Sequence, residues 1–142
     1  MPAEQARSTD RAPQLRADSV HAFLYTGQVR GDLKPVEWMG DSLERVRFFS
    51  KLARQQVGFE LEMVQHGLEP GDWKPMRIVG PGVSEIRVHV EGEHRVLYVA
   101  KFQRAVYVLH AFIKRTQKTP RGAVSLAKAR YEEVLRAEGL KK

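Results

Sequence analysis

The sequence predicts an α+β domain: an N-terminal strand, a helical hairpin, a mostly antiparallel sheet of four to five strands, and a C-terminal helix. Apolar residues recur every three or four positions between Leu43 and Leu68, the spacing of one helix face. After Trp73 they alternate with polar residues in short runs separated by turn residues, which is typical of strands. A second helical stripe follows Pro120. Helices that are separate from the strands along the chain favour the α+β class.

The N-terminal region differs from the rest of the chain in composition. Residues 1–18 are polar and show no periodicity, so we expect them to be loosely ordered. Residues 19–27 are more apolar, and they either dock on the domain as a strand or belong to an extension upstream of it. We therefore divide the chain into an N-terminal extension (1–33), a domain (34–138) and a basic tail (139–142).

Residues 35–39 are expected to form a short strand that leads into the helical segment. Asp41 is the expected N-cap of the first helix, and Glu44, three residues later, is its expected capping-box partner. Ser50 is a second candidate cap, so the segment is either a hairpin of two helices or one kinked helix. Gly67 is the expected end of this unit, because glycine adopts the left-handed conformation of a C-terminal cap at low cost.

Four strands and a helix are expected to follow. The last strand is almost continuously apolar, which indicates a strand that is central or covered on both faces. Thr119 is the expected cap of the final helix, Pro120 occupies its first position, and Gly139 ends it. The expected strands are residues 76–80, 83–90, 94–102 and 105–115, with turns at 91–93 and 103–104.

Positive charge is concentrated in the C-terminal part of the chain. The 142 residues carry a formal net charge of +7, and residues 101–131 contain eight basic side chains and no acidic one. Clustered cations on a folded segment favour binding of a polyanion such as a nucleic acid. A membrane surface fits less well, because no stretch combines this charge with an exposed apolar helix face. The eight residues are Lys101, Arg104, Lys114, Arg115, Lys118, Arg121, Lys128 and Arg130.

The residue inventory excludes familiar chemistries. The chain has no cysteine, which rules out disulfides, thiolate catalysis and cysteine-based zinc sites. It has no phosphate-binding glycine motif and no nucleophile-elbow serine. His89 and His94 flank an expected turn, and without a third ligand nearby we interpret them as solvated strand-end histidines rather than metal ligands. No apolar run is long enough to span a membrane and no signal peptide is evident, so we expect a cytoplasmic protein with no membrane partner. We also expect no cofactor.

Six cations fall on or just beyond the last three expected strands. Neighbouring strands lie about 4.8 Å apart, so side chains of this kind can converge on one patch, although the register that decides it is not visible in the sequence. His110 lies within an apolar run and is more typical of a core histidine than of a base. Tyr98, Tyr107 and Phe112 can each stack an unpaired base but are individually more typical of a core. The six cations are Arg87, Arg95, Lys101, Lys114, Arg115 and Lys118.

Three segments resemble a known family. The runs 82–87 (GVSEIR), 94–98 (HRVLY) and 109–120 (LHAFIKRTQKTP) are similar to successive strands and the tail of HigB-type toxins. These toxins belong to the RelE/ParE superfamily, here in its phage-derived branch, and the resemblance covers about residues 34–137. It implies a compact α+β fold like that of microbial ribonucleases and the toxin role in a type II toxin–antitoxin pair.

The resemblance also implies a function for individual residues. RelE-like members cut mRNA on the ribosome, and by this likeness Arg95 and Arg87 stabilise the scissile phosphate. Lys101, Lys114, Arg115 and Lys118 then hold the RNA backbone, and His110 is a proton-transfer candidate. Tyr131 is the only positional match to a tyrosine of some RelE members, and its helical spacing places it on a buried face. On this interpretation Arg95→Ala removes toxicity and leaves the fold intact.

The expected partners follow from the same resemblance. They are the ribosome with its mRNA and a helix-turn-helix antitoxin of the Cro/C1 type that covers the basic sheet. No metal is required, because an internal 2′-hydroxyl can attack the phosphate when the charge is stabilised. Two alternatives stay open: an inhibitor of DNA gyrase, as in ParE-like members, and an inactive RNA-binding module.

Overall fold

The computed structural model describes residues 2–7, 9–10 and 33–142, and the chain divides into two compact units, Met1–Leu33 and Lys34–Lys142. In the first unit, β1 (Pro2–Arg7) pairs antiparallel with β2 (Thr9–Asp10), a pairing that the sequence pattern did not predict. The strand considered for residues 19–27 lies outside the described residues.

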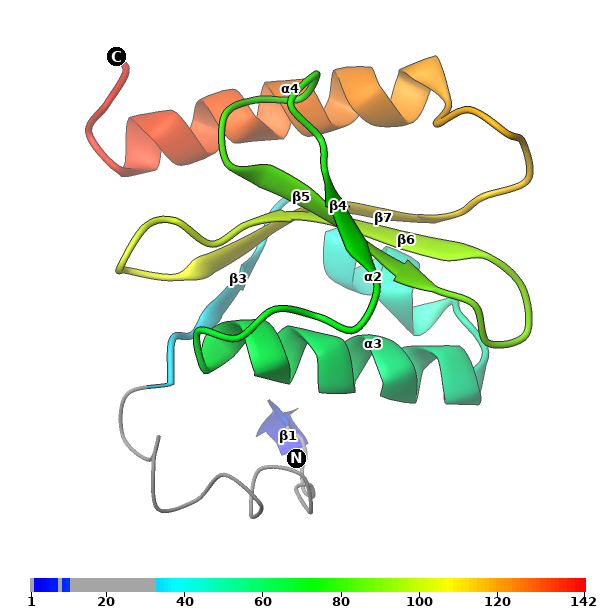
Figure 1. Ribbon diagram of the computed structural model, residues 1–142. Helices are drawn as coiled ribbons and strands as arrows, with labels where there is room; N and C mark the ends of the chain where they lie inside the picture. The colour runs from blue at the N-terminus through cyan, green and yellow to red at the C-terminus, as the bar shows by residue number, and fades with distance from the viewer. Residues whose placement is uncertain (1, 8, 11–32) are drawn as a thin grey trace. The chain divides into compact units, whose positions relative to one another are not determined.

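The second unit is built on a five-stranded mixed sheet with the order β3-β7-β6-β5-β4 (Figure 1). Only β3 runs parallel to its neighbour; the other three pairings are antiparallel. The predicted α+β class and mostly antiparallel sheet are thereby confirmed. The strands are β3 (Val36–Trp38), β4 (Trp73–Pro75), β5 (Val83–Val88), β6 (His94–Val99) and β7 (Val106–Ile113).

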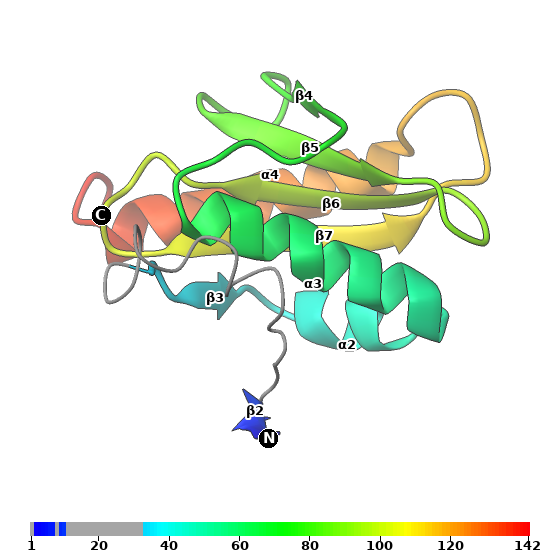
Figure 2. The ribbon, with the colours of Figure 1, turned by 60° about the horizontal axis from the view of Figure 1, so that its bottom comes forward.

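Helices cover both faces of this sheet. The hairpin of α2 (Ser42–Arg47) and α3 (Lys51–Gln65) lies on one face and α4 (Arg121–Ala137) lies on the other, as Figures 1 and 2 both show. β7 is buried along almost its whole length, as its apolar sequence predicted. The α3-side core includes Val57, Leu61, Ile86, Val96 and Val108, and the α4-side core includes Leu97, Leu109, Ala127, Tyr131 and Val134.

The helix ends agree with the sequence, but the N-terminal caps of α2 and α4 differ from those predicted. Ser50 begins α3 by accepting a hydrogen bond from the Ala53 amide at 3.2 Å, so the segment is a hairpin and not one kinked helix. Asp41 sits at the N-cap of α2 but makes no capping hydrogen bond. Its carboxylate instead accepts from Arg45 at 3.0 Å and from Arg130 at 2.8 Å, so the predicted capping box is wrong. α4 begins at Arg121, with Pro120 and not Thr119 at its N-cap.

The strand predicted over residues 76–80 is also wrong. Residues 77–79 form a turn in which the Val79 amide donates to the Met76 carbonyl at 3.0 Å, and β4 lies just before it. Met76 and Val79 are both buried in the α4-side core although they are three residues apart. The apolar composition of this short run therefore suggested a strand, but its residues do not alternate between two faces as strand residues do. A Cβ on Gly80 would lie 2.6 Å from the Tyr131 ring, which shows how closely the backbone approaches α4 here.

Both ends of the second unit are fastened near the β6–β7 turn. The Lys34 ammonium donates to the carbonyls of Ala100 at 2.6 Å and Phe102 at 2.7 Å. At the end of α4, Glu138 accepts a hydrogen bond from the Tyr107 hydroxyl. The β5–β6 turn and the β7–α4 loop lie at the opposite end of the sheet (Figure 1).

Candidate functional site

The register of the sheet brings the main predicted cations together at the end formed by the β5–β6 turn. Arg87 of β5 is the direct cross-strand partner of Arg95 of β6, so their side chains share the face that α4 covers. Arg95 in turn pairs with Phe112 of β7, and Lys114 follows that strand. The Lys114 amide donates to the Glu93 carbonyl at 2.7 Å, which fixes the start of the β7–α4 loop beside the turn.

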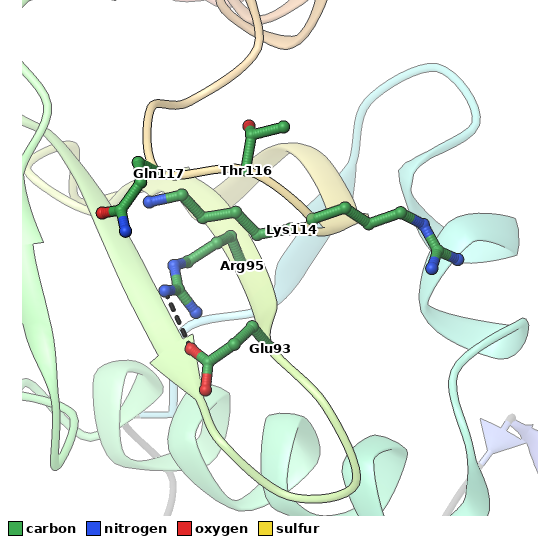
Figure 3. A pocket seen from close by; sticks show the side chains of 6 residues that line it. Glu93, Arg95, Lys114, Thr116 and Gln117 are labelled. Carbon is green, nitrogen blue, oxygen red and sulfur yellow. Dashed lines mark ion pairs between the residues drawn. The ribbon is translucent and has the colours of Figure 1, made fainter.

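An open pocket of about 650 Å³ lies between this turn and the β7–α4 loop. In Figure 3 the Lys114 side chain extends over Arg95 toward Gln117, and Glu93 lies on the other side of Arg95. Three of the predicted cations therefore meet in one hollow that is open to solvent, as a site for an anionic ligand requires. The pocket is lined by Glu93, Arg95, Lys114, Arg115, Thr116 and Gln117.

A buried carboxylate fixes the arginines of this site. Glu85 of β5 is fully buried, and its Oε1 lies 3.4 Å from Nε of Arg87 and 3.9 Å from Nε of Arg95. Arg95 itself is only 6% exposed; it donates to the His94 carbonyl at 3.0 Å and pairs with Glu93 at 2.9 Å. Because its two terminal nitrogens are held by the His94 carbonyl and the Glu93 carboxylate, the guanidinium is preorganised, and part of its charge is already balanced.

Glu93 connects Arg95 to a second set of charges. Nδ1 of His89 lies 2.9 Å from both carboxylate oxygens of Glu93, and its Nε2 lies 2.6 Å from Asp72. The hydrogen bonds to Asp72, then to Glu93, raise the pKa of His89 above its ordinary value. The bonds from His89, then from Arg95, lower the pKa of Glu93. Glu93 is thus an ionised counter-ion of Arg95 inside the pocket. Because its side chain is partly exposed, an anionic ligand can displace it from Arg95.

Three of the six predicted cations, Arg87, Lys101 and Lys118, are absent from the pocket lining, although Arg87 is the cross-strand partner of Arg95. Lys101 follows β6 at its other end, roughly 20 Å along the strand from Arg95 at the usual rise per residue. There its ammonium lies 5.2 Å from the centre of the Phe102 ring. Lys118 is exposed in the β7–α4 loop, near the pocket in sequence but absent from its lining. The single patch expected from the sequence therefore keeps Arg87, Arg95, Lys114 and Arg115 and loses Lys101 and Lys118.

The histidines and aromatic residues of the sheet belong mainly to the core. His110 is 4% exposed and stacks on Phe112 with ring centres 5.5 Å apart. Burial, assisted by Arg130, lowers the pKa of His110 to about 4, so it is neutral and shielded from any ligand in solution. The core interpretation of Tyr98 and Tyr107 is confirmed, since both are buried. Burial raises the pKa of each to about 12.

His94 corrects one sequence interpretation. It was taken to be a solvated strand-end histidine, but it is buried and packs against Phe49 with ring centres 4.5 Å apart. His89 is the exposed member of the pair and binds carboxylates. Within the described residues, no group of three or more histidine or acidic side chains is placed to hold a metal ion. Across that same part of the chain, no helix has the length and apolar character needed to cross a membrane.

Sequence reasoning missed the acidic half of the site. Glu85 lies two residues before Arg87 and so shares its strand face, which α4 covers, but it was not predicted as a site residue. The signal that could have revealed it is the stripe of the last helix, whose apolar side must cover a sheet face.

The chain was compared with models of known protein families. The model of the family described as "Phage derived protein Gp49-like (DUF891)" matches residues 44–132, which is more than half of the chain. The matched range contains all of the residues that line the pocket, together with Glu85 and Arg87. No curated protein matches the chain.

Proposed function

The chain belongs to the phage-derived Gp49-like family, and from that membership we propose that it is the toxin of a type II toxin–antitoxin system. The proposed activity is that of a ribosome-dependent mRNA endoribonuclease that arrests translation in the cytoplasm. The family supports a toxin-like protein, and the convergence of Arg95, Lys114 and Arg115 on one open pocket supports the nuclease.

The proposed reaction uses an attacking group that the substrate supplies. The ribose 2′-oxygen forms a bond to phosphorus while the bond to the 5′-oxygen breaks, which yields a 2′,3′-cyclic phosphate and a 5′-hydroxyl. The 2′-hydroxyl proton leaves to solvent or to a basic side chain, and the 5′-oxygen takes up a proton. The protein must hold the phosphate in line and neutralise its non-bridging oxygens as charge develops. Arg95 and Lys114 have this role, and Arg115 holds a neighbouring phosphate.

The occupied state of Arg95 is compatible with this role. An incoming phosphate competes with Glu93 for the guanidinium, and the displaced carboxylate keeps His89 as a partner. Lys114 is half-buried and Arg115 is exposed, so both can reach ribosomal or messenger RNA without a rearrangement of the sheet. The proposed neutralising partner is a helix-turn-helix antitoxin that covers these cations.

The test is expression of pocket variants in growing cells. Lys114→Ala and Arg115→Ala remove solvent-accessible charges and should abolish growth arrest without unfolding the protein. Lys128→Ala removes a charge from α4 that is exposed, as Arg115 is, and it is the matched control. Primer extension on ribosome-bound mRNA should show cuts with the unaltered protein and with Lys128→Ala only.

Other outcomes would replace the proposal. DNA breaks with a damage response, and no mRNA cuts, would indicate a gyrase inhibitor. Normal growth with the unaltered protein, at confirmed expression, would indicate an inactive RNA-binding module. Full toxicity of the Lys114→Ala, Arg115→Ala double variant would refute the assignment of the pocket.

A further inference from the structure

An aromatic side chain beside the candidate site is almost fully exposed to solvent. Phe48, in the turn between α2 and α3, is 86% exposed, far more than an apolar side chain of this size usually is. Basic residues surround it in sequence: Arg45, Arg47, Lys51 and Arg54 fall within residues 45–59, which contain no acidic residue. An exposed aromatic ring within an anion-attracting segment indicates a ligand that has both a π-face and negative charge.

A second hollow, of about 350 Å³, lies against this ring. Its apolar walls come from the helical hairpin and the end of β7, two elements that lie side by side (Figure 2). Arg115 lines both this hollow and the open pocket around Arg95 and Lys114, so the two hollows are neighbours. The lining includes Phe48, Phe49, Phe112, Ile113, Arg45 and Arg115.

We infer that this hollow receives one unpaired nucleobase of the RNA, stacked on Phe48, from the nucleotide next to the phosphate held by Arg95 and Lys114. The inference rests on the proposed function and adds a subsite to it. The base and its phosphate are recognised together, because Arg115 can contact the phosphate that connects the two pockets. Arg45, held by Asp41 at 3.0 Å, contributes a guanidinium at the rim of the hollow.

The chemistry of the walls favours a base over an acidic protein helix. Every nucleobase offers a flat face to an aromatic ring or a guanidinium plane, and the hollow contains both. The requirement for an unpaired base also restricts the substrate, because a paired base cannot leave its stack to enter. Single-stranded RNA is therefore the expected ligand, and duplex RNA should be excluded from this subsite.

The experiment compares intact and abasic RNA. The probe is a short single-stranded oligoribonucleotide with 2′-O-methyl riboses, which prevent cleavage, and a matched series carries one abasic position moved along the strand. Loss of the stacked base should weaken binding about 5- to 150-fold at one position only. Phe48→Ala should weaken binding of the intact probe by a similar factor and remove the abasic penalty, whereas Phe48→Trp should keep it.

Controls separate this inference from the proposed function. Ile78→Ala removes another highly exposed apolar side chain, 62% exposed, and should leave both affinities unchanged. Lys114→Ala should lower the slope of log affinity against log salt by about 0.7, the value of one single-strand phosphate contact, while Phe48→Ala leaves the slope unchanged.

Three results would overturn the inference. A uniform abasic series, or an equal loss for Phe48→Ala with intact and abasic probes, would show that Phe48 does not contact a base. Unchanged RNA affinity in Phe48→Ala would do the same and would assign the ring to a protein partner. Failure of the unaltered protein to bind RNA at any salt concentration, both as the free probe and on ribosomes, would instead refute the proposed function itself.

Discussion

The substitution Arg95→Ala tests how the candidate site is held together. The resemblance to toxins suggests that this change removes activity and leaves the fold intact. The position of Arg95 argues against the second half of that expectation, because the side chain is buried beside the fully buried carboxylate of Glu85. Alanine would leave that carboxylate with Arg87, 3.4 Å away, as its remaining cationic neighbour.

The expected cost follows from the loss of one partner in a buried ion pair, about 3–5 kcal/mol of the free energy of unfolding. Because Arg87 remains, we expect the lower end, about 3 kcal/mol. A domain of this kind has a total stability of about 5–15 kcal/mol, so the loss is a large part of it. At about 4 °C per kcal/mol, the melting temperature should fall by about 12 °C.

Urea unfolding followed by circular dichroism measures the loss directly. With a urea dependence of about 1–3 kcal/mol/M, a loss of 3 kcal/mol lowers the midpoint by about 1–3 M. The double variant Arg95→Met, Glu85→Gln removes both charges and should recover much of the stability, which makes the two changes non-additive. It also gives a folded protein in which lost cleavage is attributable to the missing charge.

A loss below about 1 kcal/mol for Arg95→Ala, a value usual for exposed ion pairs, would refute this reasoning. Strict additivity of the two changes would refute it as well, because the coupling between Arg95 and Glu85 would then be absent.

Three further predictions concern pH and packing. His89 has a folded-state pKa above its unfolded value, so its stabilising contribution is complete below about pH 6.5 and is lost as the pH rises through the folded-state value. The urea midpoint of unfolding should therefore decline from pH 5.5 to 9. In the His89→Gln variant the dependence of the midpoint on pH should be flatter. His110 has a folded-state pKa of about 4, so it contributes at most about 3 kcal/mol of stability above about pH 6.5, and this contribution is lost toward pH 4. NMR should place the titration of His110 near pH 4, and the His110→Phe variant should retain mRNA cleavage. A normal histidine titration would contradict the burial of His110. Gly80→Ala should cost about 1–3 kcal/mol of stability in thermal unfolding, because the new Cβ would meet the Tyr131 ring. In contrast, the Cβ of Gly122→Ala in α4 meets nothing within 4 Å, and this change should stabilise the protein by up to about 1 kcal/mol. Equal effects of the two changes would contradict the close approach of the Gly80 backbone to Tyr131.

Much of the fold was predictable because its signals are local. The Ser50 cap and the apolar stripe that follows it predicted α3, and the apolar run of β7 predicted a strand covered on both faces. Errors arose where tertiary contacts override local pattern. Asp41 has the composition of a capping box, but Arg130 of the distant α4 takes its carboxylate. Met76 and Val79 looked like strand residues because they are apolar, yet α4 buries them in a turn.

The site was predictable in its cations and not in its geometry. The sequence places Arg87, Arg95 and Lys101 on the expected strands, but only the register makes Arg95 the partner of Arg87 and leaves Lys101 at the other end of the sheet. The charge of Glu85 gave no hint of burial, since a carboxylate enters a core only where guanidinium groups meet it. Phe48 carried no signal at all, because an apolar residue next to a helical stripe is ordinarily assigned to that stripe.

The attachment of both chain ends of the second unit beside the β6–β7 turn has a practical consequence. Lys34 and Glu138 anchor the entering and departing chain at the end of the sheet remote from Arg95 and Lys114. A surface tether, a fluorescent reporter or a fused carrier joined after the last helix would thus point away from the anion pocket. Immobilised protein should remain fully open to large ligands, so sensor-based kinetics can be recorded without steric shielding.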